Sequence, residues 1–154
     1  MKNNKLRNFS FLEALAAKCR ERIVMTTGVF DLLSTAHADY LERAKEMGDI
    51  LIVGLHSDTL VQKRKGYLPK RDQQKRAKLL TFLSDVDYVF IIDSQDELYN
   101  SIWKIRPSTL VVSVTTTDED NCPSRMKELF DRTTELRILQ PMSDEHSSDY
   151  VLKK

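Results

Sequence analysis

Apolar residues in this chain of 154 residues fall in short runs that are separated by longer amphipathic stretches. The runs have the length of buried strands and predict strands over residues 23–27, 50–55, 87–92, 109–114 and 136–139. Between them, apolar side chains recur every three or four residues, which predicts helices over residues 37–47 and 97–105. In the second of these helices, Leu98, Ile102 and Trp103 are expected to point inward. Strands that alternate with helices predict a Rossmann-like α/β domain, with a parallel sheet of about five strands and helices on both faces.

The N-terminal residues carry a further helical signal. Ser10 and Glu13 have the spacing of a capping box, which predicts a helix that continues to about Arg22. We therefore divide the chain into an N-terminal helical extension, residues 1–22, and an α/β domain, residues 23–154. The apolar stripe of the extension is expected to pack within the chain, as such stripes usually do.

The C-terminal part of the chain is more polar. A short helix is predicted over residues 124–131, before the last strand. Residues 144–154 begin with acidic and hydroxyl side chains and end with apolar and basic ones, which predicts a helix with Ser147 and Ser148 at its N-terminus.

The loop between the first strand and the next helix is the first candidate for chemistry. The strand ends at Gly28, and His37 falls where the helix begins. The N–H groups in the first turn of a helix have no partner within the helix, so this position suits an anion. His37 is therefore a candidate ligand-binding residue, and helix capping is its alternative role. His56, at the end of the second strand, is expected to make a structural hydrogen bond, and contact with a ligand in the nearby crevice is its alternative role. Ser57 and Asp58 are expected to cap a helix.

Residues 63–78 form the most strongly charged stretch, with eight basic residues against one acid, Asp72. Gly66 and Pro69 predict that the first half of this stretch is a loop rather than one face of a helix. A cationic loop beside an anion site is suited to hold phosphate groups. A solvated surface is the alternative.

Composition limits the functional classes. With 41% hydrophobic residues, 31% charged residues and a net charge of +1, the chain reads as a soluble globular protein with no general attraction to nucleic acid or membrane. Its two cysteines, Cys19 and Cys122, lack C-x-x-C spacing and suit a reducing compartment. We expect a cytoplasmic protein.

The segment from Ile23 to Asp58 resembles the opening of the cytidylyltransferase-like nucleotidyltransferases, the group that contains glycerol-3-phosphate cytidylyltransferase and heptose-1-phosphate adenylyltransferase. The hallmark of that family is G-x-F-D-x-x-H-x-G-H, and four of its positions are matched, by Gly28, Phe30, Asp31 and His37. Ser34 stands in place of the first histidine of the motif, and Ala36 in place of its glycine. The resemblance extends over roughly residues 22 to 153.

The resemblance implies transfer of a nucleotidyl group from CTP or ATP to a phosphorylated small molecule, with release of pyrophosphate. It also implies Mg²⁺ bound with the triphosphate, a homodimer, and no metal site built by the protein. The catalytic residues that it implies are His37, Lys65 and Arg76. The nucleotide-binding residues that it implies are Thr27, Gly28, Val29, Phe30, Ser34, His37, Lys63, Ser147 and Ser148. Alanine at Lys65 or Arg76 is then expected to weaken triphosphate binding and to leave the fold intact.

Two functions from different classes remain at this point. Ser34 offers a hydrogen bond but no charge, and Ala36 adds a methyl group where the family motif has none. Loss of one donor to the transition state commonly lowers a rate by about 100- to 1000-fold. The chain is therefore either a divergent nucleotidyltransferase or a domain that binds a nucleotide or a partner without turnover.

Overall fold

The computed structural model describes residues 4–113, 134–139 and 149–150. Its strands are β1 (Ile23–Gly28), β2 (Ile50–His56), β3 (Tyr88–Ile92), β4 (Thr109–Ser113), β5 (Glu135–Leu139) and β6 (Asp149–Tyr150). Its helices are α1 (Phe9–Lys18), α2 (Thr35–Glu46), α3 (Asp58–Lys65), α4 (Gln73–Thr81) and α5 (Gln95–Ile105). The helix predicted over residues 124–131, and Cys122, lie outside the described residues.

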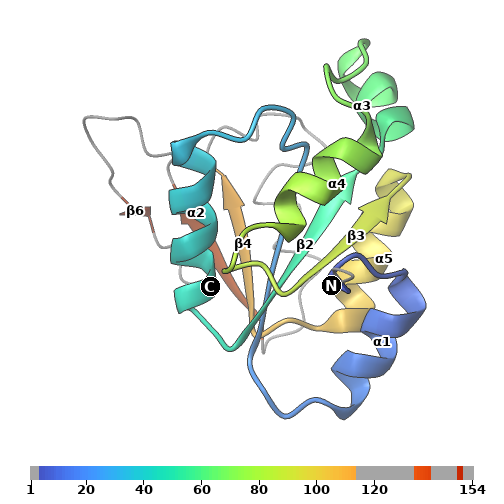
Figure 1. Ribbon diagram of the computed structural model, residues 1–154. Coiled ribbons are helices and arrows are strands. Elements are labelled where there is room, and N and C mark those ends of the chain that lie inside the picture. The colour runs from blue at the N-terminus through green and yellow to red at the C-terminus, as the bar shows by residue number, and fades with distance from the viewer. Residues whose placement is uncertain (1–3, 114–133, 140–148, 151–154) are drawn as a thin grey trace.

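The strands form one sheet in the order β3-β2-β1-β4-β5-β6. The first five are parallel, so the predicted Rossmann-like α/β fold with five parallel strands is confirmed (Figure 1). The strand order reverses between β1 and β4, which is where open α/β sheets bind their ligands. The short β6 pairs antiparallel with β5, so the helix predicted over the C-terminal residues is wrong at Asp149 and Tyr150.

Helices cover both faces of the sheet (Figure 1). On one face, α2 and α4 bury an apolar layer with β1 and β2, to which Leu41 and Leu80 contribute. On the other face, α1 and α5 pack against the strands through residues such as Leu12 and Ile102. Trp103 was predicted to point inward with Ile102, but its side chain is 52% exposed. None of the helices in the described ranges is long and apolar enough to cross a membrane.

The N-terminal extension adds to one edge of the sheet. Asn8, rather than Ser10, caps α1 by accepting a hydrogen bond from the Phe11 N–H, and the helix ends at Lys18 instead of Arg22. Before the helix, the Val89 N–H donates to the Lys5 carbonyl at 2.8 Å, and the Arg7 N–H donates to the Val89 carbonyl at 2.9 Å. The extension therefore packs within the chain, both through α1 and along the edge of β3.

Gly54 in β2 allows neighbouring side chains to close over the strand. A Cβ atom at this position would lie 2.6 Å from Ile92 Cδ1, 3.1 Å from Thr27 Cγ2 and 3.2 Å from Phe90 Cζ. The closest of these is the end of a flexible side chain. The most severe of the three contacts is thus with one methyl group.

We predict that Gly54→Ala lowers the free energy of unfolding by about 1–3 kcal/mol, because the added methyl overpacks this face. Ile92→Val removes the Cδ1 methyl and is expected to cost about 0.5–1.5 kcal/mol alone. The double variant should lose less unfolding free energy than the sum of the two single losses, because removal of the Ile92 methyl relieves the overpacking by the alanine. Urea unfolding of the four proteins measures this coupling, and strictly additive losses would contradict it.

Candidate active site

The loop that follows β1 begins with an unusual backbone turn. Phe30 has a φ of 49°, in the left-handed region that side chains other than glycine rarely adopt. Its ring folds back over the end of β1, where a Cβ at Gly28 would lie 2.9 Å from Phe30 Cε2. The ring is 8% exposed and packs edge-on against the ring of His37, with centroids 5.8 Å apart. Gly28 and the strained turn thus place the imidazole beside the strand end.

His37 and Ser34 together cap α2. The Ser34 N–H donates to His37 Nδ1 at 3.3 Å, and the His37 N–H donates to Ser34 Oγ at 3.4 Å. His37 therefore does cap α2, and its ligand-binding role stays a prediction. Because Nδ1 accepts a backbone hydrogen, the neutral ring carries its proton on Nε2, which is left as a donor. Burial lowers the pKa of His37, so the neutral form predominates at neutral pH.

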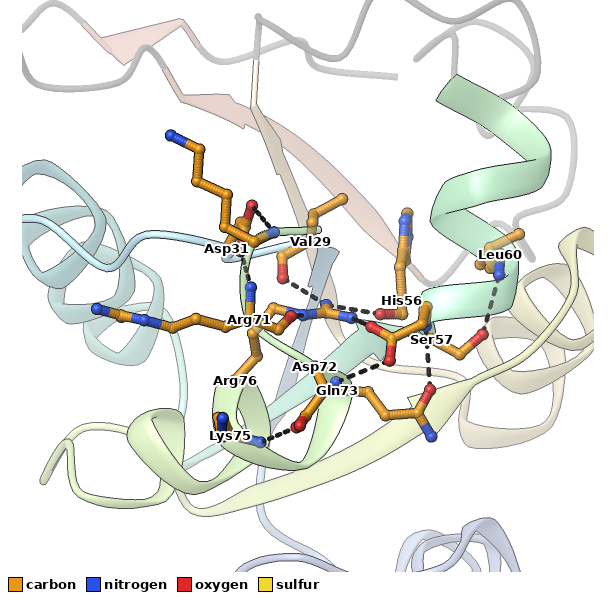
Figure 2. Close-up of polar contacts among 12 residues, drawn as sticks. Val29, Asp31, His56, Ser57, Leu60, Arg71, Asp72, Gln73, Lys75 and Arg76 are labelled. Atoms are coloured by element: carbon orange, nitrogen blue, oxygen red, sulfur yellow. Dashed lines mark hydrogen bonds and ion pairs between the residues drawn. The ribbon is translucent and has the colours of Figure 1, made fainter. Parts of the chain in front are cut away.

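Arg76 lies beneath this loop rather than on its surface. Its side chain is 0% exposed, and Nη1 donates to the Val29 carbonyl at 2.8 Å and to the His56 carbonyl at 2.7 Å (Figure 2). Nε donates to the Arg71 carbonyl at 2.9 Å, and Nη2 bonds to Asp58 Oδ1 at 2.7 Å. One guanidinium therefore joins the ends of β1 and β2 to the starts of α3 and α4. The expectation that Arg76→Ala leaves the fold intact is inconsistent with this burial.

Two carboxylates fix the loop between α3 and α4. Asp31 accepts hydrogen bonds from the backbone N–H groups of Lys70 and Arg71 at 2.9 and 3.0 Å. Burial favours the neutral carboxyl, but these bonds and the charge of Arg76 hold the pKa of Asp31 below its usual value. Asp58 exchanges hydrogen bonds with Gln73 at 3.0 and 3.3 Å. The loop is thus tied to the strand ends on both sides.

The roles of these carboxylates differ from those expected. Ser57 alone caps α3, by accepting from the Leu60 N–H at 3.0 Å, whereas Asp58 is the ion-pair partner of Arg76. A signal for this pairing is present in the sequence, because Arg76 lies four residues before the buried Leu80 and thus on the apolar face of α4. No sequence pattern identifies Asp31 as the anchor of a loop some 40 residues away.

Lys63 and Lys65 belong to the last turn of α3, not to a loop, and Gly66 ends this helix with a φ of 81°. The prediction of a loop here is wrong because a glycine after a charge run also marks a helix C-terminus. Both lysines are exposed. The loop itself is confined to residues 66–72, between α3 and α4.

His56 is buried at the carboxyl end of β2, with 4% of its surface exposed. Its Nε2 atom has no hydrogen-bond partner in the described part of the chain, contrary to the structural hydrogen bond that was expected. Burial, with the charges of Arg64, Lys65 and Arg76, lowers the pKa of His56 to about 3. A neutral and unsatisfied imidazole thus lies beside three cations.

The structure brings together most of the residues that the sequence analysis selected. Those at the end of β1 and the start of α2 are Thr27, Gly28, Val29, Phe30, Ser34 and His37. Ser147 and Ser148 lie outside the described residues. No group of three or more His, Cys, Asp or Glu side chains within residues 4–113, 134–139 and 149–150 has an arrangement that fits a metal ion.

Comparison with known proteins identifies the family. The sequence model of the cytidylyltransferase-like family matches residues 25–151, which is most of the chain. The chain belongs to the cytidylyltransferase-like family. The resemblance inferred from Gly28, Phe30, Asp31 and His37 is therefore confirmed, and the nucleotidyltransferase-like class is confirmed at the level of the family.

Curated relatives of this cytidylyltransferase-like chain include the bifunctional protein HldE. The Campylobacter concisus protein is 44% identical over 110 residues, which are 70% of this chain and 23% of that protein. The Geobacter sulfurreducens protein is 38% identical over 111 residues, which are 70% of this chain and 22% of that protein. The chain thus spans less than a quarter of the length of these relatives.

Solved structures share the fold. A lipopolysaccharide core biosynthesis protein from Thermoplasma volcanium superposes with a TM-score of 0.64 at 25% identity, over 84% of this chain and 98% of that one. A pantoate-β-alanine ligase from Francisella tularensis superposes with a TM-score of 0.63 at 13% identity, over 91% and 68% of the two chains. The second likeness shows the fold alone.

We predict that Arg76→Met lowers the free energy of unfolding by about 3 kcal/mol, because it leaves Asp58 without its counter-ion and several carbonyls without a donor. Arg71→Ala, which removes a neighbouring exposed side chain, should change it by no more than about 0.5 kcal/mol. Adding Asp58→Asn to Arg76→Met should recover part of the loss. Denaturant unfolding measures all three, and an Arg76→Met protein as stable as Arg71→Ala would contradict the role of the guanidinium.

His56 should make stability depend on pH. The unfolded imidazole gains a proton below about pH 6.5 and the folded one only near pH 3, so the unfolded state binds more protons between these values. Stability should therefore fall by roughly 2 kcal/mol between pH 7.5 and pH 5 through this group alone. In His56→Asn that contribution disappears, so the unfolding free energies of wild type and His56→Asn should converge as the pH is lowered. If the plots of unfolding free energy against pH stay parallel for the two proteins, His56 does not titrate in this way.

Proposed function

We propose that this chain transfers a nucleotidyl group from CTP or ATP to a phosphorylated small molecule and releases pyrophosphate. The observation that carries the proposal is the position of His37 in the first turn of α2, at the carboxyl end of β1 and next to the reversal of strand order. Its Nδ1 atom is occupied by the Ser34 N–H, so Nε2 is a fixed donor. The first turn of the helix adds favourable backbone dipoles for a phosphate.

Nucleotidyl transfer depends more on charged groups held in position around the phosphates than on a covalent intermediate with the protein. The acceptor oxygen attacks the α-phosphorus, the bond from that phosphorus to the bridging oxygen breaks, and pyrophosphate leaves with the bond electrons. His37 Nε2–H would donate to the α-phosphate as charge builds on it. Lys63 and Lys65, both exposed on α3, would hold the triphosphate from one side. Together these groups stabilise the anion that leaves.

Within this proposal, Arg76 is a positioning residue. Its guanidinium bonds to carbonyls of the chain and to Asp58, and it sets the distance between the β1 loop and α3. Asp31 acts in the same way on the loop between α3 and α4. Both residues would influence nucleotide binding through the atoms that they hold in place.

Mg²⁺ is expected to accompany the triphosphate. The carboxylates nearest to the site, Asp31 and Asp58, already accept hydrogen bonds from the chain. The ion would therefore be held by phosphate oxygens and water rather than by these side chains. A homodimer and a cytoplasmic location are also part of the proposal, the first from the resemblance and the second from composition.

A second function, nucleotide binding without turnover, is favoured by one observation. Ser34 occupies the position of a histidine in the family motif, and its hydroxyl is used to cap α2 and to contact His37 Nδ1 at 3.0 Å. It adds no charge toward a phosphate. A site built in this way could keep its affinity for a triphosphate and lose rate.

We predict that His37→Gln lowers pyrophosphate release by about 100- to 1000-fold, because the imidazole donor is lost. Glutamine at this helix position can still reach the backbone of residue 34 as in a capping box, so the fold should be kept. Release is measured with CTP or ATP and either glycerol 3-phosphate or a heptose 1-phosphate as the acceptor. Nucleotide affinity is measured in parallel by calorimetry, with and without Mg²⁺.

The parallel titrations separate the two functions. A wild-type protein that binds a nucleotide but releases no pyrophosphate with any acceptor supports binding without turnover. A wild-type protein that binds neither CTP nor ATP would rule out both functions. Equal rates for wild type and His37→Gln would remove His37 from the chemistry.

A further inference from the structure

Tyr40 and Thr26 make a buried polar contact between α2 and β1. Their two hydroxyl oxygens lie 3.0 Å apart and share one hydrogen bond. Tyr40 is 6% exposed and Thr26 is 0% exposed, so water is not at hand to replace either partner. Removal of one hydroxyl would leave the other buried and unpaired, which is the costly case for a hydrogen bond. The contact therefore joins the helix to the strand at one defined point.

The two ends of this contact lie in a rigid strand and in the turn next to the candidate active site. Thr26 pairs with Val53 of β2 and with Val111 of β4, so β1 is held on both sides at this residue. Tyr40 lies three residues after His37, so the two side chains are neighbours on successive turns of α2. The central strand thus restrains the part of the helix that carries His37.

Apolar packing alone does not fix how far α2 can slide along the sheet. Its other buried side chains, Leu41 and Ala44, pack into the aliphatic layer on this face. Burial of apolar surface is non-directional, and packed helices can shift by small shear movements. A hydrogen bond has narrow limits of distance and angle, so the contact between Tyr40 and Thr26 selects one position of the helix.

That position decides where the His37 donor lies. The ring contacts Phe30, and its Nδ1 atom accepts from the Ser34 N–H, so the orientation and the tautomer of the ring are set locally. The distance from Nε2 to a phosphate at the end of β1 is set by the helix as a whole. We propose that the hydrogen bond between Tyr40 and Thr26 positions His37 Nε2 for the α-phosphate. This inference rests on the proposed function.

Tyr40 acts through His37 and takes no part in proton transfer. Burial raises the pKa of Tyr40, and this effect outweighs the bond to Thr26 and the charge of Arg43, which both lower it. The hydroxyl therefore stays protonated at neutral pH, and the contact persists there. Tyr40 is thus a positioning residue rather than a catalytic one.

Two variants separate positioning from stability. Tyr40→Phe leaves the Thr26 hydroxyl unpaired, so the melting temperature should fall by a few degrees. Adding Thr26→Val replaces both partners by apolar groups of similar shape, so the double variant should regain most of that stability. Pyrophosphate release should stay about 10- to 100-fold slower than wild type in both, because a displacement of about 1 Å can cost about 100-fold. If the contact only stabilised the fold, the rate would recover in the double variant.

A double-mutant cycle tests whether Tyr40 acts through the imidazole. Release is measured with CTP or ATP and with glycerol 3-phosphate or a heptose 1-phosphate as the acceptor. Tyr40→Phe should change the rate of the His37→Gln protein by less than about 2-fold, because no imidazole donor is left to displace. The pH dependence of the rate should keep its wild-type shape in Tyr40→Phe.

Thr134→Val is the matched control. The Thr134 hydroxyl is also buried, and it donates to the Pro107 carbonyl at 2.7 Å, just before β5 begins at the amino end of the sheet. Its loss should lower the melting temperature and leave the rate of pyrophosphate release unchanged. This control therefore shows what loss of a buried hydroxyl does when the hydroxyl is remote from His37.

The position of His37 can also be followed without turnover. The ring nitrogen resonances of His37, assigned with the His37→Gln protein, should shift at Nε2 when CTP or ATP is added to wild type. The shift should be smaller in the variant that combines Tyr40→Phe with Thr26→Val. A wild-type protein that shows this difference but releases no pyrophosphate would support the positioning contact while the proposed reaction failed.

Several results would overturn the positioning role. One is a wild-type rate, or a wild-type shift of the His37 resonance, in the variant that lacks both hydroxyls. Another is an equal loss from Tyr40→Phe in the wild-type and His37→Gln proteins, which would make the contact a general support of the fold. A wild-type protein that binds neither CTP nor ATP would remove the ligand for which His37 is positioned.

Discussion

The arrangement of the site depends on a single buried charge. The guanidinium of Arg76 is removed from water and is bonded to three carbonyls and one carboxylate. Isolation of such a charge would cost several kcal/mol, and only a nearly complete set of acceptors makes it tolerable. The acceptors come from Val29 just after β1, from β2, from α3 and from Arg71 in the loop before α4, so these segments can be correctly placed only when all of them meet. The contacts of Arg76 therefore determine both the stability of this region and the geometry of the site.

Around that charge, the β1 loop is held from several directions. Phe30 adopts a backbone conformation that costs about 1–3 kcal/mol, and its ring is pressed onto Gly28 and His37. Asp31 in the same loop binds two backbone N–H groups of the loop between α3 and α4. The capping box of Ser34 and His37 then fixes which ring nitrogen carries the proton. A loop held at each of these points can present a donor to a phosphate with little reorganisation.

The sequence was sufficient for the five parallel strands and for the loop that carries His37, but not for β6. Apolar runs and the G-x-F-D pattern depend on local periodicity and on short-range turn chemistry, which a single sequence records directly. The predictions were wrong where one residue type or spacing fits two different local structures. Gly66 marked a helix end rather than a loop, Asn8 capped α1 in place of Ser10, and Trp103 lay at a helical spacing that pointed it outward. The burial of Arg76 and the unsatisfied ring of His56 follow from which strands are neighbours, and no local pattern contains that information.

The backbone of residues 5–7 occupies hydrogen-bonding positions along β3, which would otherwise be an outer strand. Unprotected outer strands are templates for intermolecular pairing, and native proteins usually cover or interrupt them. On the far side of the sheet, β6 runs antiparallel to β5 and so interrupts the parallel pattern there. Residues 5–7 and β6 thus protect the two edges of the parallel strands from pairing with the strands of another molecule. A fragment cut at the start of β1 would keep the loop after β1 and still lose the protection that residues 5–7 give to β3.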